Sequence, residues 1–331
     1  MFLGDPNLGM MMGAIPMGNS TSIFALAHNN APYLSVYDTD TMERQDTVAS
    51  PPTSTGLGIA VNPDETILAV STSATPFVAL YNMADWSRLP NLPVLPIGIS
   101  RSLAFSPDGS ILVAVQDSSP YLSIYNTSDW SKLPNPSVLP TGQPIRVRFN
   151  HSGTLLVVAH AVSPFITIYN TTDWSKVSNP AILPTGAGRG LSFNPDDSIL
   201  AVGHDSSPYL SLYDTATWTK LPNPSILPTT TYVADVAYSP DGLLLALGHS
   251  TAPYVFIYDT TDWSKLPDLA IAPTGTPHSA TISPDGTKLA IGHATYPYMT
   301  IYNTLDWSKL PDPSAPVTGT GNDGIFFHGA L

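Results

Sequence analysis

The chain has no cysteine, few charged residues and only two glutamates among its 331 residues. Without cysteine, neither a disulfide nor a thiolate metal site can form within it. Its 12 lysines and arginines stand against 25 aspartates and glutamates, for a net charge of -13. Half of these cations recur at one repeat position and are therefore spread evenly: Arg88, Lys132, Lys176, Lys220, Lys265 and Lys309. No basic stripe is left to follow a phosphate backbone, so we expect no nucleic-acid partner.

Long hydrophobic runs are also missing. No stretch approaches the roughly 18 uninterrupted apolar residues of a membrane-spanning helix, so we expect no membrane insertion. The acidic balance also disfavours binding to an anionic membrane surface. Residues 1–17 lack the basic start and the unbroken apolar core of a secretory signal. The sequence therefore predicts synthesis in the cytoplasm without a signal peptide, which leaves later assembly into an external particle open.

What the chain does contain is a repeat. All of its tryptophans recur at spacings of 44, 44, 44, 45 and 44 residues: Trp86, Trp130, Trp174, Trp218, Trp263 and Trp307. One period before Trp86, Met42 stands in a degenerate seventh copy of the surrounding segment. Self-similarity at this period indicates stacked structural repeats, and it outweighs the two domains that length alone suggests.

One repeat unit, residues 101–142, predicts four short strands. They are expected at 102–106, 111–115, 121–125 and, after a proline-rich loop, near 137–140. Pro107 and Gly109 mark the first turn, because proline presets φ and glycine accepts a positive φ. Four antiparallel strands per unit are typical of a propeller blade. The chain is therefore predicted to be an all-β, seven-bladed β-propeller of four-stranded antiparallel blades.

Ring closure can also be predicted. The second, third and fourth strands occur seven times, but the first strand occurs only six times between residues 57 and 283. The segment 323–328 stands one period after 278–283, whereas the N-terminal candidate 13–17 contains a proline, which weakens a central strand. We expect the C-terminal strand to join the N-terminal blade and so remove the open edges. Residues 1–17 then form an N-terminal arm, and residues 18–331 the propeller.

These units resemble WD40-like and YVTN-type seven-bladed propellers over about residues 18–331. The resemblance rests on Leu103-Ala-Phe-Ser-Pro-Asp-Gly109, Leu112-Val-Ala-Val115 and Leu122-Ser-Ile-Tyr-Asn-Thr127. The chain departs from WD40 units in that its tryptophan follows aspartate, as in Asp129-Trp130, and precedes a proline-rich loop. The units are also similar to WD40-like proteins carried by tailed bacteriophages as virion or tail components. The resemblance implies an interaction platform more often than an enzyme.

Two polar residue types recur in register. Histidine closes the second strand in five units, at His28, His160, His204, His249 and His293. Such a ring could bind metal or respond to pH, but neighbouring blades hold the imidazoles too far apart for one metal site. Hydrogen bonds to the following turn are the simpler interpretation.

An aspartate precedes tryptophan in five units, where capping of its own turn is favoured over calcium binding because Thr217 replaces it in a sixth. No cofactor or metal is expected.

The tryptophans and the N-terminal arm are the candidate interaction residues. Exposed, the six tryptophans would form an aromatic belt for protein or glycan contact. Wedged between blades, they would be packing residues, which regular repetition favours. The arm contains Met10, Met11 and Met12, flexible apolar side chains suited to docking into a neighbour.

Breaks in the repeat mark a second candidate region. The first strands carry small residues at most alternate positions, but Arg146, Arg148, Asp235 and Asp323 interrupt that pattern. Arg101, Arg189 and His278 stand at strand beginnings near one mouth of the expected channel. We hypothesise an asymmetric polar pocket at this mouth. The alternative is that these groups pair across blades or face channel water.

The sequence thus favours a non-catalytic binding or structural module. The resemblance points to a virion-associated protein of a tailed phage, located in the tail, an adhesin or the capsid surface. Its partners would be other virion proteins, or a host glycan or receptor. The alternative is a hydrolase or lactonase-like enzyme with a polar or metal site at the channel mouth, but no phosphate loop, zinc motif or nucleophile elbow supports it.

Overall fold

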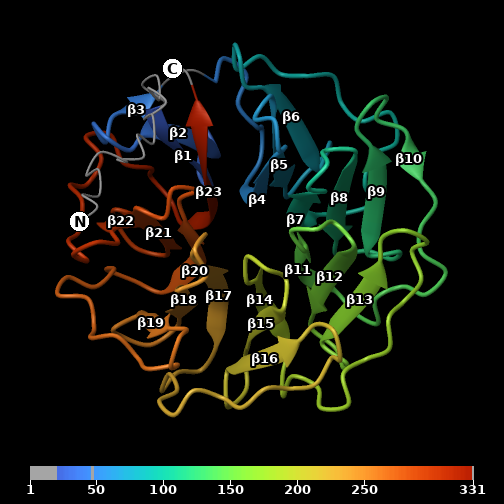
Figure 1. Ribbon diagram of the computed structural model, residues 1–331. Helices are drawn as coiled ribbons and strands as arrows, with labels where there is room; N and C mark the ends of the chain where they lie inside the picture. Colours follow the sequence, from blue (N-terminus) through green and yellow to red (C-terminus); the bar gives the residue numbers. More distant parts are fainter. Residues whose placement is uncertain (1–20, 46–47, 330–331) are drawn as a thin grey trace, which may run out of the picture.

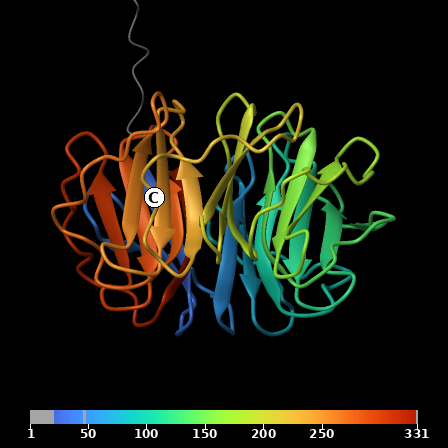
Figure 2. The ribbon, with the colours of Figure 1, turned by 90° about the horizontal axis from the view of Figure 1, so that it is seen from below.

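Seven antiparallel sheets are arranged around a central axis in the computed structural model, which describes residues 21–45 and 48–329 (Figure 1). Seen from the side, the ring is a short, wide cylinder (Figure 2). The chain is therefore an all-β, seven-bladed propeller, as the repeat predicts.

Each sheet begins with a strand next to the central channel. Six of these first strands are β4 (Gly56–Val61), β7 (Ser100–Phe105), β11 (Pro144–Phe149), β14 (Gly188–Phe193), β17 (Val233–Tyr238) and β20 (Pro277–Ile282). The second strands are β1 (Thr21–His28), β5 (Ile67–Thr72), β8 (Ile111–Gln116), β12 (Leu155–His160), β15 (Ile199–His204), β18 (Leu244–His249) and β21 (Lys288–His293). The third are β2 (Leu34–Asp38), β6 (Val78–Asn82), β9 (Leu122–Asn126), β13 (Ile166–Asn170), β16 (Leu210–Asp214), β19 (Val255–Asp259) and β22 (Met299–Asn303).

The fourth strands differ from the prediction. Only two sheets have one, β3 (Arg44–Gln45) and β10 (Lys132–Leu133); in the other five, a single bridge such as Tyr81 to Arg88 takes its place. The expected strand near 137–140 is wrong, because the outer pairing occurs directly after the tryptophan turn, between Leu133 and Ile124. The proline-rich segment that follows cannot supply a regular set of amide donors to a ladder.

The ring closes as predicted. Strand β23 (Gly321–Gly329) pairs antiparallel with β1, so the first sheet has the order β23-β1-β2-β3. Phe326 and Phe24 stand opposite each other in this register, and their ring centroids are 4.9 Å apart. The two ends of the described chain therefore lie in one blade, and neither leaves an inner sheet edge open.

The turns between first and second strands follow from local sequence. In the third blade, Gly109 has a φ of 72° and its amide donates to Ser106 O at 2.8 Å. Asp108 Oδ1 accepts from the Ser110 amide at 3.0 Å. Proline, aspartate and glycine thus each supply one element of the turn: a fixed φ, a side-chain acceptor and a positive φ.

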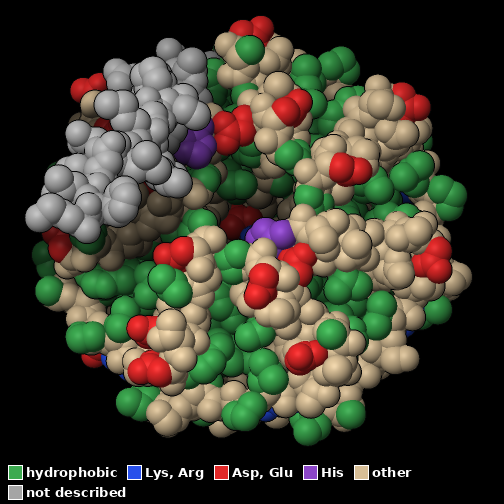
Figure 3. Space-filling view, in the orientation of Figure 1, with side chains coloured by type: hydrophobic (Ala, Val, Ile, Leu, Met, Phe, Trp, Pro, Cys, Tyr) green, Lys and Arg blue, Asp and Glu red, His purple; other side chains and the backbone are tan. Residues whose placement is uncertain are grey.

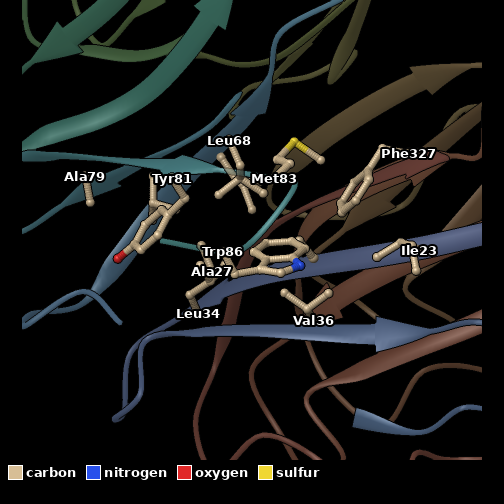
Figure 4. Close-up of a cluster of buried hydrophobic side chains, with 13 residues drawn as sticks. Ile23, Ala27, Leu34, Val36, Leu68, Ala79, Tyr81, Met83, Trp86 and Phe327 are labelled. Carbon is tan, nitrogen blue, oxygen red and sulfur yellow. The ribbon is translucent and has the colours of Figure 1, made fainter. Parts of the chain in front are cut away.

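The hydrophobic core lies between adjacent blades. Figure 4 shows one junction, in which Trp86 and Met83 of the second blade meet Ile23, Val36 and Phe327 of the first. The Trp86 and Phe327 ring centroids are 6.2 Å apart. Six comparable clusters fill the other junctions, so each blade buries its face only against its neighbours.

A tyrosine in six of the seven third strands links neighbouring blades. The Tyr125 hydroxyl donates to Val94 O at 2.8 Å, which is in the proline-rich loop of the preceding blade. Equivalent bonds run from Tyr37, Tyr81, Tyr169, Tyr258 and Tyr302. Burial raises the pKa of Tyr125 to about 12, so the hydroxyl stays protonated and able to donate. These bonds fix the loops at the rim of the ring.

Replacing Tyr125 by phenylalanine tests this link. We expect Tyr125→Phe to lower the free energy of unfolding by about 1 kcal/mol, because the Val94 carbonyl loses its donor. Urea unfolding at pH 7 measures it. Tyr213→Phe is the matched control: within the described residues the Tyr213 hydroxyl is buried without a hydrogen-bond partner, so its removal should be neutral or slightly stabilising. Equal losses in both variants would contradict a role for the inter-blade bond.

Candidate functional site

The side chains that break the repeat meet inside the channel. Arg146 of β11 has its Nη2 3.2 Å from Asp235 Oδ2 of β17 and its Nη1 3.1 Å from Asp323 Oδ2 of β23. These three strands belong to three different blades, so the ion pairs cross the channel. Of the two predicted alternatives for Arg146, Asp235 and Asp323, pairing across blades is therefore the one observed.

This cross-channel cluster is almost completely buried. The exposed fractions of the three side chains are 7%, 2% and 4% for Arg146, Asp235 and Asp323. The carboxylates also accept backbone amides: Asp323 Oδ2 from Ile59 at 3.3 Å, and Asp235 Oδ2 from Ala280 at 3.2 Å. Each carboxylate thus joins the strand of a neighbouring blade as well as the guanidinium. The cluster ties five blades together around the axis.

Burial and charge act in opposite directions on these groups. Burial opposes the charge of Arg146, but Asp235 and Asp323 together outweigh burial and raise the pKa of Arg146. Burial raises the pKa of Asp235, against the attraction of Arg146 and Arg148. Since two carboxylates share one fully engaged guanidinium, each is only partly compensated. Without Arg146, both buried carboxylates would lose their shared counter-charge.

Three predicted residues stand at the channel mouth beside this cluster. Arg101, Arg189 and His278 are each the extra residue of a β-bulge at the start of a first strand. The Arg189 guanidinium lies over the Tyr232 ring at 4.6 Å, with Nη2 3.7 Å from Asp205 Oδ2. The His278 carbonyl accepts from Arg146 Nη2 at 3.3 Å. Burial, then Arg146 and Arg189, lower the pKa of the half-buried His278 imidazole, so it is neutral at pH 7.

Arg148 does not join the other predicted residues. It follows Arg146 by two positions on β11, so it faces the channel one layer further from the mouth. There it lines a cavity of about 360 Å³ at the opposite end of the channel, with Phe105, Phe149 and His151 among its walls. Figure 3 shows a hollow at the centre of one face of the ring, with acidic side chains around it. The predicted residues thus lie on two sides of the cross-channel cluster: Arg148 lines the cavity at one end of the channel, and Arg101, Arg189 and His278 stand at the other.

The recurring histidines are structural. His28, His160, His204 and His293 are buried, and the Nε2 of each lies 2.9 or 3.0 Å from a serine or threonine hydroxyl seven residues later, in the third strand. This hydroxyl is a partner that the sequence did not predict. The following turn, which was the predicted partner, also acts on the ring, because backbone hydrogen bonding there favours the protonated imidazole and opposes the lowering of its pKa, at Asn30, Val162, Ser206 and Thr295. Gln116 takes the same place in the third blade, with its Oε1 accepting from Ser123 at 2.9 Å. His249 instead meets Phe256 edge to face, with centroids 5.1 Å apart.

The aspartates before tryptophan cap their turns, as predicted. Asp129 Oδ1 accepts from the Ser131 amide at 2.9 Å, and the same bond recurs at Asp85, Asp173, Asp262 and Asp306. These bonds lower the pKa of Asp129. Each tryptophan after these five aspartates has a φ between 57° and 59°, a left-handed conformation that such a capped turn supports.

The six tryptophans pack at the junctions between blades. Trp86 is buried, and Trp130, Trp174, Trp218, Trp263 and Trp307 are half-buried against the cluster shared with the preceding blade. Packing is thus one of their roles. Their remaining exposed edges still reach the rim, as at Trp218, which lines a groove of about 280 Å³.

One set of surface residues was not predicted from the sequence. In the proline-rich loops of five consecutive blades, a branched aliphatic side chain at one repeat position is 47% to 61% exposed: Val94, Val138, Ile182, Ile226 and Ile271. Ile182 lies in the same groove as Trp218 and Lys220 of the next blade. An aliphatic residue at this position is visible as a repeat in the sequence, but the segment around Val138 is the one predicted as a fourth strand, near residues 137–140. We call these five side chains the rim aliphatics.

Met10, Met11 and Met12 lie outside the described residues. Among residues 21–45 and 48–329, no group of three or more histidine, aspartate or glutamate side chains has the geometry to hold a metal ion. The same part of the chain contains no helix long and apolar enough to cross a membrane.

Comparison with known proteins reveals the fold alone. No family model and no curated protein matches the sequence. Hydrazine synthase of Kuenenia stuttgartiensis is a similar solved structure, with a TM-score of 0.66 and 18% identity over 82% of this chain and 89% of that one. At this identity the likeness supports a shared β-propeller architecture and carries no activity across.

Removing the central cation tests the cross-channel cluster. We expect Arg146→Met to lower the free energy of unfolding at pH 7 by about 3 kcal/mol or more, because two carboxylates stay buried without their counter-charge. The pKa of Asp235, already raised, should rise further. A carboxyl group whose pKa is higher in the folded protein than in the unfolded chain destabilises the fold as pH rises through that higher pKa. The loss of stability in Arg146→Met should therefore become smaller as pH falls towards 4. Urea unfolding at pH 7 and pH 5 measures both effects. Arg101→Met, at the mouth, is the control and should cost far less.

The histidines predict a second pH dependence. Burial lowers the pKa of His28, His204, His249 and His293 to about 4, from an ordinary value near 6.5. The unfolded chain therefore binds more protons, and stability should fall as pH drops from about 6.5 to 4. His204→Gln copies the side chain already present at Gln116. It should flatten part of this decline in a urea series across that range and change stability little at pH 7; an unchanged slope would rule the mechanism out.

Proposed function

We propose that this propeller is a non-catalytic binding and structural module that attaches through its rim to other proteins of a larger assembly. The observation that carries the proposal is the pairing of a half-buried tryptophan with an exposed aliphatic side chain at the same blade junction. Protein interfaces are enriched in aromatic residues, and energetic anchors are commonly tryptophan in partly closed pockets. The groove lined by Trp218 and Ile182 supplies both features.

The groove between the fourth and fifth blades is the clearest example. Trp218 and Lys220 come from one blade, and Pro180 and Ile182 from the loop of the other. Ile182 is 61% exposed although it is branched and apolar. A partner that covers this groove would remove apolar area from water on both sides of it, at about 25 cal/mol per Å².

The rim presents this chemistry several times. The carbonyls of Val94, Val138, Ile226 and Ile271 accept the inter-blade tyrosine hydroxyls, which hold the backbone of these loops in place. Four of the five exposed side chains are therefore displayed on fixed backbone, which lowers the entropy that binding must remove. Isolated exposed aliphatic residues are common on protein surfaces. Five at one repeat position make a multivalent surface.

The resemblance to WD40-like proteins of tailed phages supports a virion as that assembly, with tail, adhesin or capsid-surface locations as its forms. A host glycan or receptor is the partner that an adhesin would contact. The enzyme alternative needs a carboxylate free to activate water or bind a metal. Asp235 and Asp323, which were its candidates, are both engaged by Arg146 and by backbone amides.

A rim variant tests the proposal in the native source. We expect Val138→Ser, Ile182→Ser and Ile226→Ser together to reduce co-sedimentation with the particle at least about tenfold, because several apolar contacts are lost at once. Mass spectrometry of gradient fractions measures the ratio to capsid and tail proteins. Leu305→Ser is the control, since Leu305 is 92% exposed but lies in a tryptophan turn outside the rim aliphatics.

The outcomes separate the parts of the proposal. Recovery of the wild-type protein only as a free monomer would contradict a virion role. Wild-type co-migration with an unchanged triple variant would contradict attachment through the rim. Circular dichroism of the variants confirms that each is folded before its distribution is compared.

A further inference from the structure

The cavity around Arg148 is a formed pocket in the channel, and the proposed attachment through the rim does not involve it. Its walls come from the ends of five first strands, β4, β7, β11, β20 and β23. Small and apolar residues dominate the lining, including Ala60, Ala104 and Ile325, and its polar residues are Arg148, Asn150, His151 and Thr281. A volume of about 360 Å³ is within the range of small-molecule sites, which are mostly apolar with a few placed polar groups.

Within the part of the chain that the structure describes, Arg148 is the one guanidinium that lines this cavity. Its Nη1 donates to the carbonyl of Val147 at 3.1 Å, and among the described residues it lies in no ion pair within 4 Å. No aspartate or glutamate of residues 21–45 and 48–329 lines the cavity. The nearest buried carboxylates, Asp235 and Asp323, belong to the cross-channel cluster. Burial, and then the neighbouring charge of Arg146, lower the pKa of Arg148, so its surroundings disfavour its charge more than they compensate it.

The cavity is closed on one side and open on the other. The cross-channel cluster lies one layer towards the mouth, where Arg146 is bonded to three other blades. The open side faces the turns after the first strands, which include Pro107 and His151. A molecule that enters from those turns therefore reaches Arg148 without displacing an ion pair.

The aspartates around the open end of the cavity limit the charge of such a molecule. Asp108, Asp196, Asp197, Asp241 and Asp285 stand in the turns on this side, and the whole chain carries a net charge of -13. His151 is paired with Asp197, with Nδ1 2.9 Å from Oδ1, so it adds little free positive charge. A highly charged anion such as a phosphate would be repelled by this ring of carboxylates. A molecule with one negative charge and an apolar body suits both the apolar walls of the cavity and the acidic side chains around its open end.

We propose that the channel cavity binds a small apolar monocarboxylate, whose carboxylate is held by the Arg148 guanidinium and whose body lies against Phe105, Phe149 and Ile325. The planar guanidinium matches a carboxylate with two parallel hydrogen bonds. This is a separate site from the rim grooves, with one copy per ring, and it does not depend on the rim proposal.

Matched probes test the ligand class on the wild-type protein. Phenylacetate and phenylacetamide share shape and size but differ in charge, and inorganic phosphate supplies charge without an apolar body. We expect phenylacetate to bind at least about tenfold more tightly than phenylacetamide, and phosphate to show no binding at this site. Calorimetry with 1:1 stoichiometry and ligand-observed NMR measure it. Equal affinity for acid and amide, or no binding of phenylacetate at millimolar concentration, would overturn the proposal.

Variants locate the binding in the cavity. Arg148→Met should reduce phenylacetate affinity at least about tenfold, and Arg148→Lys should retain part of it because the charge remains. Thr281→Phe should abolish binding by filling the cavity, with Arg148 untouched. Arg101→Met, beyond the cross-channel cluster, should leave the affinity unchanged. If Arg148→Met does not fold, Thr281→Phe still decides the question: undiminished binding there would show that phenylacetate occupies another place.

Discussion

The antiparallel pairing of β23 with β1 is the constraint on which the rest of the structure depends. It joins segments from the two ends of the chain in one blade, with Phe24 and Phe326 in contact at the seam. Once the ring is closed, every blade has two neighbours, and each hydrophobic face is covered. The same pairing places Asp323 in the channel, where it completes the ion pairs of Arg146. Closure and the polar centre of the channel are thus formed by one strand.

The fold could be predicted because the same turn residues and strand patterns recur in seven units. Turn residues such as Pro107 and Gly109 act within a few residues, and strand alternation acts along one segment, so both are readable without a structure. The outermost strand was misplaced because proline-rich loops and short bridges have no strong period. Val138 has the composition of a strand residue, yet its carbonyl is taken by Tyr169 of the next blade, a contact that sequence spacing alone does not reveal.

The candidate site was predicted only in part, for a physical reason. Breaks in the repeat identified Arg146, Arg148, Asp235 and Asp323 as unusual, but the partners of a long side chain depend on distances across the channel. Arg146 reaches carboxylates two and three blades away, whereas Arg148, on the same face of the same strand, reaches neither within ion-pair distance. A rise of two residues along one strand, about 7 Å, separates a satisfied cation from one that faces a cavity.

The rim presents repeated contact sites, whereas the channel presents one. The two surfaces therefore suit different kinds of ligand. The rim is built from the repeated part of each unit, so a partner there can make the same contact at several blades and gain affinity from their number. The channel is built where the repeat is broken, and Arg148 occurs once. A small molecule bound at Arg148 touches strands from five blades without contacting the rim grooves. Because the cross-channel cluster already joins four of those strands, β4, β11, β20 and β23, such binding would stabilise the closed ring while leaving the rim free for a protein partner.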